Sequence, residues 1–324
     1  MKSRHLFFLV VMVIAGHGFL APASSRAENF PSRPIQFIIP NVAGSSMDNS
    51  ARALADELEK VLGTKVVSNN KPGASTVLGT DAAIRANKDG YTILYAGLSS
   101  LVIAPIINPE LVHYDPAKDL ESLGFHYYLP NTVNARSDSP WKTFSELIDF
   151  ARMDPGKIRV ATSGIGHPTH FILEMIQAMT GTQFVHVPFK GGAPVVTSVL
   201  GGHLEICIDA FANVKPHVDT GKMRVLLITN KMPAFPEIPT ITELGFKQNL
   251  PVGWMGVWAP SGIPEEARKV LVPAIEKAVK NSKPRIEQLW GLCEYKSPVE
   301  QARMREEQYK QIYEVAVKTG LRKQ

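Results

Sequence analysis

The feature that most constrains this sequence is a repeated alternation of short β-type runs with amphipathic helical patterns. In the first unit, a β-type run at Ile35–Ile39 precedes apolar residues that recur at helical spacing from Ala51 to Leu62, and Gly63 then stops the pattern. A strand followed by a helix in this way is a βα unit. Repeats of that unit build a mostly parallel sheet with helices on its faces.

The alternation falls into two blocks, which predicts an α/β protein with two lobes. The first block continues with a strand at 66–67, a helix at 81–86 and a strand at 91–95. In the second block, strands and helices alternate at 158–161, 170–179, 184–187, 194–200, 205–208 and 225–229. The chain after residue 264 has the pattern of two or three helices.

Two extended stretches lie between the blocks, at 125–133 and in the aromatic run Trp254 to Trp258. We expect the chain to cross between the lobes at both, and two crossings imply a hinge. On this prediction the first lobe comprises residues 28–127 and 251–324, and the second comprises residues 128–250.

Residues 1–27 differ in kind from the rest of the chain. Lys2 and Arg4 precede an apolar run at 6–20, and small residues follow up to Ala27. This pattern is typical of a secretory signal peptide, here cut after Ala27, and predicts a periplasmic protein. A membrane anchor is the alternative, but the run is shorter than the roughly 20 apolar residues that a span needs.

The charge and the cysteines of the chain narrow the class of protein further. Removing Lys2, Arg4 and Arg26 takes the formal net charge from +5 to +2, and such a balanced surface gives no reason to expect nucleic acid. An oxidising compartment permits disulfides, yet Cys207 and Cys293 are better interpreted as two separate buried thiols.

Two loops rich in glycine and hydroxyl groups are the first candidates for a binding site. One follows the first strand at 40–48, the other spans 162–170, and each leads into a helix. The N-terminus of a helix exposes unpaired N–H groups and the positive end of the helix dipole, which suits an anion. Such loops lie at the carboxyl ends of strands and would face each other across a cleft. Alternatively, Ser45, Ser46 and Asp48 merely cap the helix.

Other polar side chains near these loops allow several chemistries. His167 and His170 lack the spaced acidic or cysteine partners of a metal site, so a helix-capping or ligand-contacting role is preferred. Ser163 has no nucleophile elbow around it and no assignable base. Lys190 either favours an anion or is a solvated lysine in a turn, and Asp209 either caps the next helix or accepts hydrogen bonds from the cleft loops.

Short motifs follow one another in a fixed order from about residue 30 to the C-terminus. They are Pro31-Ser32-Arg33-Pro34-Ile35, the stretch Gly44 to Asp48, Asn70-Lys71-Pro72-Gly73-Ala74, Asp89-Gly90-Tyr91-Thr92, Tyr114-Asp115-Pro116, His186-Val187-Pro188-Phe189-Lys190-Gly191, Leu200-Gly201-Gly202 and Ala259-Pro260-Ser261-Gly262. Each motif is weak alone. In this order the chain resembles the Bug, or TctC-type, substrate-binding proteins of tripartite tricarboxylate transport systems.

The resemblance implies a Venus-flytrap fold, usually monomeric, that binds a small organic carboxylate between its lobes and delivers it to a membrane transporter. It implies no catalysis and no cofactor. Carried over position by position, the first-lobe contacts would be Ala43, Gly44, Ser45, Ser46, Asp48, Gly97, Ser99 and Ser100. The second-lobe contacts would be Ser163, Gly164, Gly166, His167 and His170, with Lys190 and Asp209 nearby.

Four departures from the family pattern bear on the ligand. Asn41 replaces an aromatic residue, Ala43 a proline, the stretch 45–47 a Gly-Gly-Thr, and His167 a threonine. Asn41 should widen the pocket and add a polar contact, while His167 adds a donor or a ring for stacking. The ligand is therefore expected to be larger than aspartate or malate, for example an aromatic carboxylate.

Two other functions remain open at this stage. A sensory protein of the same fold would present the same ligand to a receptor kinase, and the sequence does not separate this role from transport. A periplasmic hydrolase would use Ser163 with a histidine, and turnover of an ester or amide would reveal it.

Overall fold

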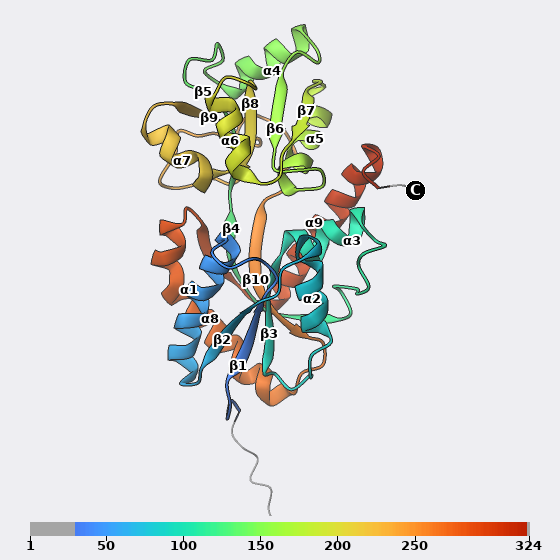
Figure 1. Ribbon diagram of the computed structural model, residues 1–324, viewed down its shortest axis with the longest axis vertical. Coiled ribbons are helices and arrows are strands. Elements are labelled where there is room, and N and C mark those ends of the chain that lie inside the picture. Colours follow the sequence, from blue (N-terminus) through green and yellow to red (C-terminus); the bar gives the residue numbers. More distant parts are fainter. Residues whose placement is uncertain (1–29, 323–324) are drawn as a thin grey trace, which may run out of the picture.

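The computed structural model of the protein describes residues 30–322 and shows two lobes stacked end to end (Figure 1). The predicted signal peptide at 1–27, with its cleavage site, lies outside these residues. Over 30–322, no helix combines the length and the apolar character that a membrane span requires.

The first lobe is built on a six-stranded sheet in the order β11-β4-β10-β3-β1-β2. Its strands are β1 (Ile35–Ile39), β2 (Val66–Asn70), β3 (Thr92–Gly97), β4 (Leu120–Leu129), β10 (Gly253–Pro260) and β11 (Leu292–Lys296). Strand β1 runs parallel to β2 and β3, whereas β10 runs antiparallel to β3 and β4. Its helices are α1 (Ser46–Leu62), α2 (Val77–Ile84), α3 (Ala104–Ile107), α8 (Glu265–Gln288) and α9 (Pro298–Lys318), with a 3₁₀ turn at Ala74–Thr76 and a π turn at Ser99–Ile103.

The second lobe is built on a five-stranded sheet in the order β7-β6-β8-β5-β9. Its strands are β5 (Asn131–Arg136), β6 (Arg159–Thr162), β7 (Val185–Pro188), β8 (Ile206–Ala210) and β9 (Met223–Ile228). Only β5 runs against its neighbours. The helices are α4 (Phe144–Met153), α5 (Pro168–Thr180), α6 (Gly192–Leu200) and α7 (Phe211–Asp219). The predicted two-lobed α/β architecture is confirmed. The sheets, which were predicted to be mostly parallel, are mixed.

One predicted crossing between the lobes was misplaced. The chain leaves the first sheet with β4 and enters the second with β5 at Asn131, inside the predicted stretch 125–133. The aromatic run Trp254 to Trp258, by contrast, lies within β10, which pairs with strands on both sides. Both tryptophans are fully buried there, so the run is apolar because the strand is interior to its lobe. The return crossing from the second lobe to the first therefore lies before β10.

Helix α1 matters most for the site, and local sequence explains both of its ends. The Ser45 side chain accepts a hydrogen bond from the Asp48 N–H at the N-terminus. Gly63 adopts the left-handed conformation at the C-terminus and donates its N–H to the Glu59 carbonyl at 2.9 Å. In the predicted apolar stripe, Ala51 to Leu62, the side chains of Ala51, Leu54, Ala55 and Leu58 are buried against the first-lobe sheet and α8, and Leu62 is half-buried.

A buried polar network also ties α1 to the middle of the first lobe. The Tyr95 hydroxyl lies 3.2 Å from Ser50 Oγ on α1 and 2.7 Å from His126 Nδ1, and His126 Nε2 lies 3.0 Å from Ser282 Oγ on α8. All four side chains are buried. Burial lowers the pKa of His126 to about 3, so its ring is neutral at pH 7.

The C-terminal helix α9 spans both lobes on one flank of the molecule (Figure 1). It packs on β4 of the first lobe and on α5 of the second. Gln311 Nε2 donates to the Asn249 carbonyl at 2.7 Å, and Phe171 of α5 is buried among first-lobe residues that include Ile312. Helix α9 therefore links the lobes through packing contacts and a hydrogen bond.

A second contact between the lobes lies at the end of α8. Trp290 packs against Phe211 and Phe235 of the second lobe, with ring centroids 5.9 and 5.8 Å away, and Lys215 Nζ lies 4.6 Å from its centroid. Trp290 adopts a left-handed backbone with φ of 58°. Such a conformation is costly for a bulky residue, so the aromatic packing has to hold it in place.

The two cysteines are unpaired thiols, as predicted. Cys207 is buried in β8, and Cys293 is half-buried in β11. Burial raises the pKa of the Cys293 thiol to about 11 and that of Cys207 further, so neither is a thiolate at neutral pH.

Candidate functional site

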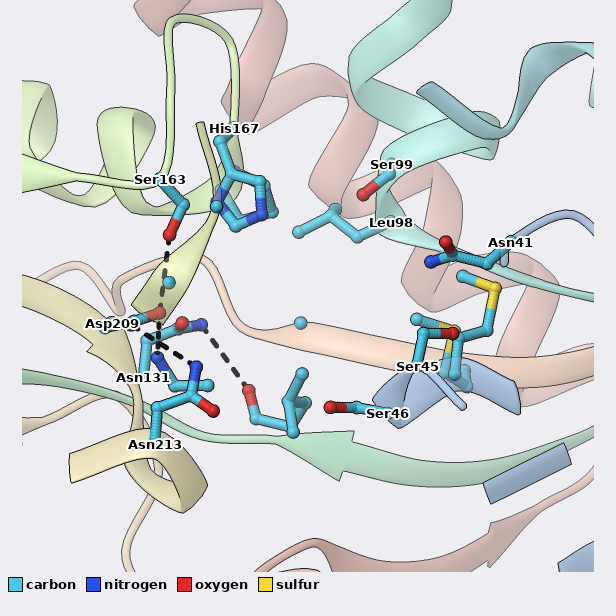
Figure 2. A pocket seen from close by; sticks show the side chains of 18 of the residues that line it. Asn41, Ser45, Ser46, Leu98, Ser99, Asn131, Ser163, His167, Asp209 and Asn213 are labelled. Carbon is cyan, nitrogen blue, oxygen red and sulfur yellow. Dashed lines mark hydrogen bonds between the residues drawn. The ribbon is translucent and has the colours of Figure 1, made fainter. Parts of the chain in front are cut away.

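A cavity of about 410 Å³ lies between the lobes, where loops of both meet the crossing strands. Figure 2 shows first-lobe side chains, among them Asn41, Ser45 and Ser99, facing second-lobe side chains such as Ser163 and Asp209. The volume lies within the usual range for small-molecule sites. The complete lining is Asn41, Ser45, Ser46, Met47, Thr76, Leu98, Ser99, Leu129, Asn131, Ser163, His167, Pro168, Gly191, Gly192, Asp209, Ala210, Asn213, Gly253, Trp254 and Met255.

The N-terminus of α1 opens directly into this cavity. Ser45 caps the N–H of Asp48, but the N–H groups of Ser46 and Met47 have no hydrogen-bond partner within residues 30–322. Both residues line the cavity. Because the helix dipole adds partial positive charge at this end, the start of α1 presents two free donors to an anion.

Asp48 shapes the loop before α1 instead of reaching the cavity. Its buried carboxylate accepts hydrogen bonds from Gly44 N at 2.8 Å, Arg52 Nε at 2.9 Å and Asn70 Nδ2 at 2.8 Å. Burial acts to raise the pKa of Asp48, but the bonds from Arg52, Gly44 and Asn70 outweigh it and lower the pKa. Asn70 also donates to the Asn41 carbonyl at 3.0 Å, so this network fixes the whole loop.

The N-terminus of α5 is closed by its own side chains. Position N1 is Pro168, which has no N–H, and the next N–H, that of Thr169, points at His167 Nδ1 at 3.4 Å. The N–H of His170 donates to the His167 carbonyl at 2.9 Å. No backbone donor of this first turn is left for a ligand.

His167 instead offers its ring to the cavity (Figure 2). Thr169 Oγ1 accepts the N–H of Ser163 at 3.2 Å, so its own hydrogen is free for His167 Nδ1 at 3.0 Å. With Nδ1 an acceptor, the hydrogen of the neutral ring lies on Nε2. Crowding by protein atoms lowers the pKa of His167 to about 4, although part of the ring faces the open cavity. His167 therefore presents a neutral N–H donor at pH 7.

Asp209 is the acidic group of the cavity. Its Oδ1 accepts from Ala210 N at 2.8 Å and from Ser163 Oγ at 3.4 Å, and its Oδ2 accepts from Asn213 Nδ2 at 3.3 Å. Burial raises the pKa of Asp209 against the opposing effect of these donors. Of the two roles considered from the sequence, acceptance from the cleft loops is present, because Asp209 accepts from Ser163. The capping role is not, because α7 begins after Ala210 and has no side-chain cap.

Seven of the predicted contact residues line the cavity: Asn41, Ser45, Ser46, Ser99, Ser163, His167 and Asp209. Nine do not: Ala43, Gly44, Asp48, Gly97, Ser100, Gly164, Gly166, His170 and Lys190.

Several of these nine have evident structural roles. A Cβ on Gly97 would lie 1.7 Å from the Trp254 carbonyl, so glycine permits the close approach of β3 and β10. Gly166 has φ of 72° and lies against Ile107 of the first lobe. His170 is buried and stacks on His186 with ring centroids 4.1 Å apart. Lys190 is exposed.

Sequence reasoning missed the lining residues that come from the crossings and from the second-lobe turns. Asn131 begins β5 directly after the first crossing, and residues 253–255 begin β10 after the second. Gly191 and Gly192 stand in a strand-to-helix turn that the sequence had singled out only for Lys190. Asn213 lies one helical turn after Asp209, a spacing that favours their hydrogen bond.

The charges and pairings of the site limit its chemistry. No lysine or arginine belongs to the cavity lining, and the part of the chain that is described holds no cluster of three His, Cys, Asp or Glu residues suited to a metal. The Ser163 hydroxyl is bonded to Asp209, and His167 Nδ1 to Thr169. The pairing of serine with a histidine base that a hydrolase needs is therefore not formed by these residues.

Comparison with known proteins agrees with this geometry. The sequence model of TctC, described as the tripartite tricarboxylate transporter family receptor, matches residues 50–319. The chain belongs to this family. Members of the TctC family are non-enzymatic, periplasmic solute-binding proteins.

Relatives of known name or structure support the assignment to the TctC family. Protein BugT of Bordetella pertussis is 32% identical over 264 residues, which cover 81% of this chain and 80% of BugT. Rpa4515 of R. palustris, solved with adipate, is 25% identical with a TM-score of 0.75, covering 90% of this chain and 98% of that one. MatC from Rhodopseudomonas palustris, solved with bound malate, is 26% identical with a TM-score of 0.72, covering 88% and 99%.

Proposed function

We propose that this protein captures a small organic carboxylate in the cleft between its lobes and delivers it to a tripartite tricarboxylate-type membrane transporter. The observation that carries the proposal is the open N-terminus of α1, with the unpaired N–H groups of Ser46 and Met47 on the cavity wall. Structures of two relatives, bound to adipate and to malate, support a carboxylate as the class of ligand.

In the proposed complex, both lobes hold one carboxylate. The first lobe donates from the Ser46 and Met47 backbone and from the Ser45 and Ser99 hydroxyls, and the second donates from His167 Nε2. Contacts from both sides are strongest when the lobes are close, so binding shifts the protein toward its closed state. We further propose that export depends on the signal peptide at 1–27, with cleavage after Ala27 and action in the periplasm.

Ligand binding can be tested by thermal unfolding of the protein from Glu28 onward, stripped of carried-over ligand. The panel comprises aliphatic and aromatic mono-, di- and tricarboxylates. A ligand at about 100 times its dissociation constant stabilises the folded state by roughly 2.7 kcal/mol, a clear rise in melting temperature. No rise with any carboxylate, in folded protein, would contradict the proposal.

The transporter half of the proposal needs a test in cells. Deleting the gene should abolish uptake of the ligand found by thermal unfolding, and restoring it should recover uptake. Retained uptake with lost induction of the ligand's catabolic genes would contradict transport and indicate a sensory role.

A further inference from the structure

The two ends of the cavity differ because an acidic side chain lies at only one of them. The first-lobe end is rich in donors, since the Ser46 and Met47 N–H groups are free and Asn41 keeps its Nδ2 donors while Oδ1 accepts from Val42 N at 2.8 Å. The second-lobe end carries the Asp209 carboxylate (Figure 2). A ligand that spans the cavity therefore meets free backbone donors at the start of α1 and, at the other end, the single acidic group of the lining.

Asp209 is held firmly in this position. The residue is 3% exposed, and three donors from Ala210, Ser163 and Asn213 fix both carboxylate oxygens. A Cβ on Gly192 would lie only 2.5 Å from Asp209 Oδ2, so the start of α6 abuts the same carboxylate. In the second lobe, the starts of α6 and α7 thus lie against the protein's own acid.

We infer that the ligand is asymmetric, with a carboxylate at the start of α1 and a hydrogen-bond donor, a hydroxyl or an ammonium group, against Asp209. The inference rests on the proposed function, from which it takes the position of the carboxylate. A second ligand carboxylate at Asp209 would bring two anions together where no lysine or arginine lines the wall. A hydroxyl or ammonium would instead give the carboxylate a further donor.

The raised pKa of Asp209 agrees with this assignment, because burial already disfavours negative charge at that end. The two possible donor groups of the ligand, hydroxyl and ammonium, depend differently on the charge of Asp209. An ammonium gains most if Asp209 is ionised in the complex, whereas a hydroxyl binds either form.

Calorimetric titration with matched acids tests the inference. For chains of four, five and six carbons, the dicarboxylate is compared with the ω-hydroxy acid, the ω-amino acid and the α,ω-diol, and benzene-1,4-dicarboxylate is compared with 4-hydroxybenzoate. At the chain length that binds best, the hydroxy or amino acid should bind at least tenfold more tightly than its dicarboxylate. The diol should not bind.

Variants at Asp209 separate its charge from its structural role. Asp209→Asn keeps an acceptor for Ala210 N but removes the charge, so the preference for the hydroxy or amino acid should fall at least tenfold. Asp149→Asn, the same change on the exposed face of α4, should leave the preference unchanged and serves as the control. Melting temperatures of both variants check that they are folded.

The outcomes distinguish this inference from the proposed function. A wild-type protein that binds the dicarboxylate as tightly as its hydroxy and amino partners, or an unchanged preference in folded Asp209→Asn, would overturn the inference and leave carboxylate capture standing. A diol that binds as tightly as the hydroxy acid, or no binding by any acid, would overturn carboxylate capture itself.

Discussion

The helices α1 and α5 both begin at the cavity, one from each lobe, yet they meet it differently. Helix α1 leaves the N–H groups of Ser46 and Met47 free, whereas α5 closes its first turn with Pro168 and the ring of His167. In the proposed complex, α1 therefore contributes backbone donors, whereas the start of α5 contributes a side chain. A single substitution can alter a side chain, so we expect the choice of ligand to depend more on the second lobe.

The largest loss of ligand affinity should come from a substitution that places a protein carboxylate at the start of α1. Ser46→Asp places a carboxylate in the first turn, where the helix dipole stabilises it, so the melting temperature should stay level or rise. The same charge occupies the anion site and repels the ligand, and affinity should fall at least ~100-fold by calorimetry, about 2.7 kcal/mol. Ser46→Asn is the neutral control. Undiminished affinity in Ser46→Asp would mean that α1 does not hold the carboxylate.

The buried polar network around His126, which ties α1 to the first lobe, predicts that stability depends on pH. His126 has a pKa of about 3 in the folded lobe and about 6.5 when unfolded. Its contribution to the free energy of unfolding is therefore complete above pH 6.5 and declines as the pH falls toward 3. Between pH 7.5 and 4.5 this histidine should cost on the order of 2 kcal/mol of unfolding free energy. Urea denaturation of wild type and His126→Gln at both pH values checks it, and equal pH slopes would refute the assignment.

A smaller effect is expected at the start of α5. His167→Asn keeps an acceptor for the Thr169 N–H but does not extend as far into the cavity, so affinity should fall about tenfold, or 1.4 kcal/mol, with stability little changed. His167→Ala should lose the cap as well, about 1 kcal/mol of stability. Calorimetry and thermal unfolding of both variants separate the two roles. Equal affinity for wild type and His167→Asn would count against a ligand contact.

The smallest change in ligand affinity is expected from a substitution of Lys190. Its side chain is exposed and does not line the cavity, so Lys190→Ala should change affinity less than twofold. Titrations at about 0.05 and 0.5 M salt should also give similar affinities. A loss of tenfold or more on substitution would place a cation near the ligand after all.

The loops of the site could be predicted because they depend on local sequence. A β-type run, small residues, a capping serine and an apolar stripe lie within some 25 residues from Ile35 to Leu58, and they place the start of α1 at the edge of its sheet. The same reasoning located Ser163 and His167.

The remaining features depend on residues that are distant in sequence. Asp48 turns away from the cavity because Arg52 and Asn70 hold it, and no local pattern indicates Asn70. The aromatic run at 254–258 has the same composition whether it crosses between lobes or lies inside a sheet. Asn131 and Asn213 reach the cavity only because the strands before them end there.

Helix α9 contacts both lobes, so its packing depends on the angle between them. It packs on β4, the π turn at Ser99–Ile103 and α3 of the first lobe, and on α5 of the second. A change in the angle between the lobes would therefore shift the contact of α9 with α5. That shift occurs on a flank of the molecule, away from the ligand. A partner that contacted α9 and α5 together would therefore respond to the angle between the lobes without contacting the ligand.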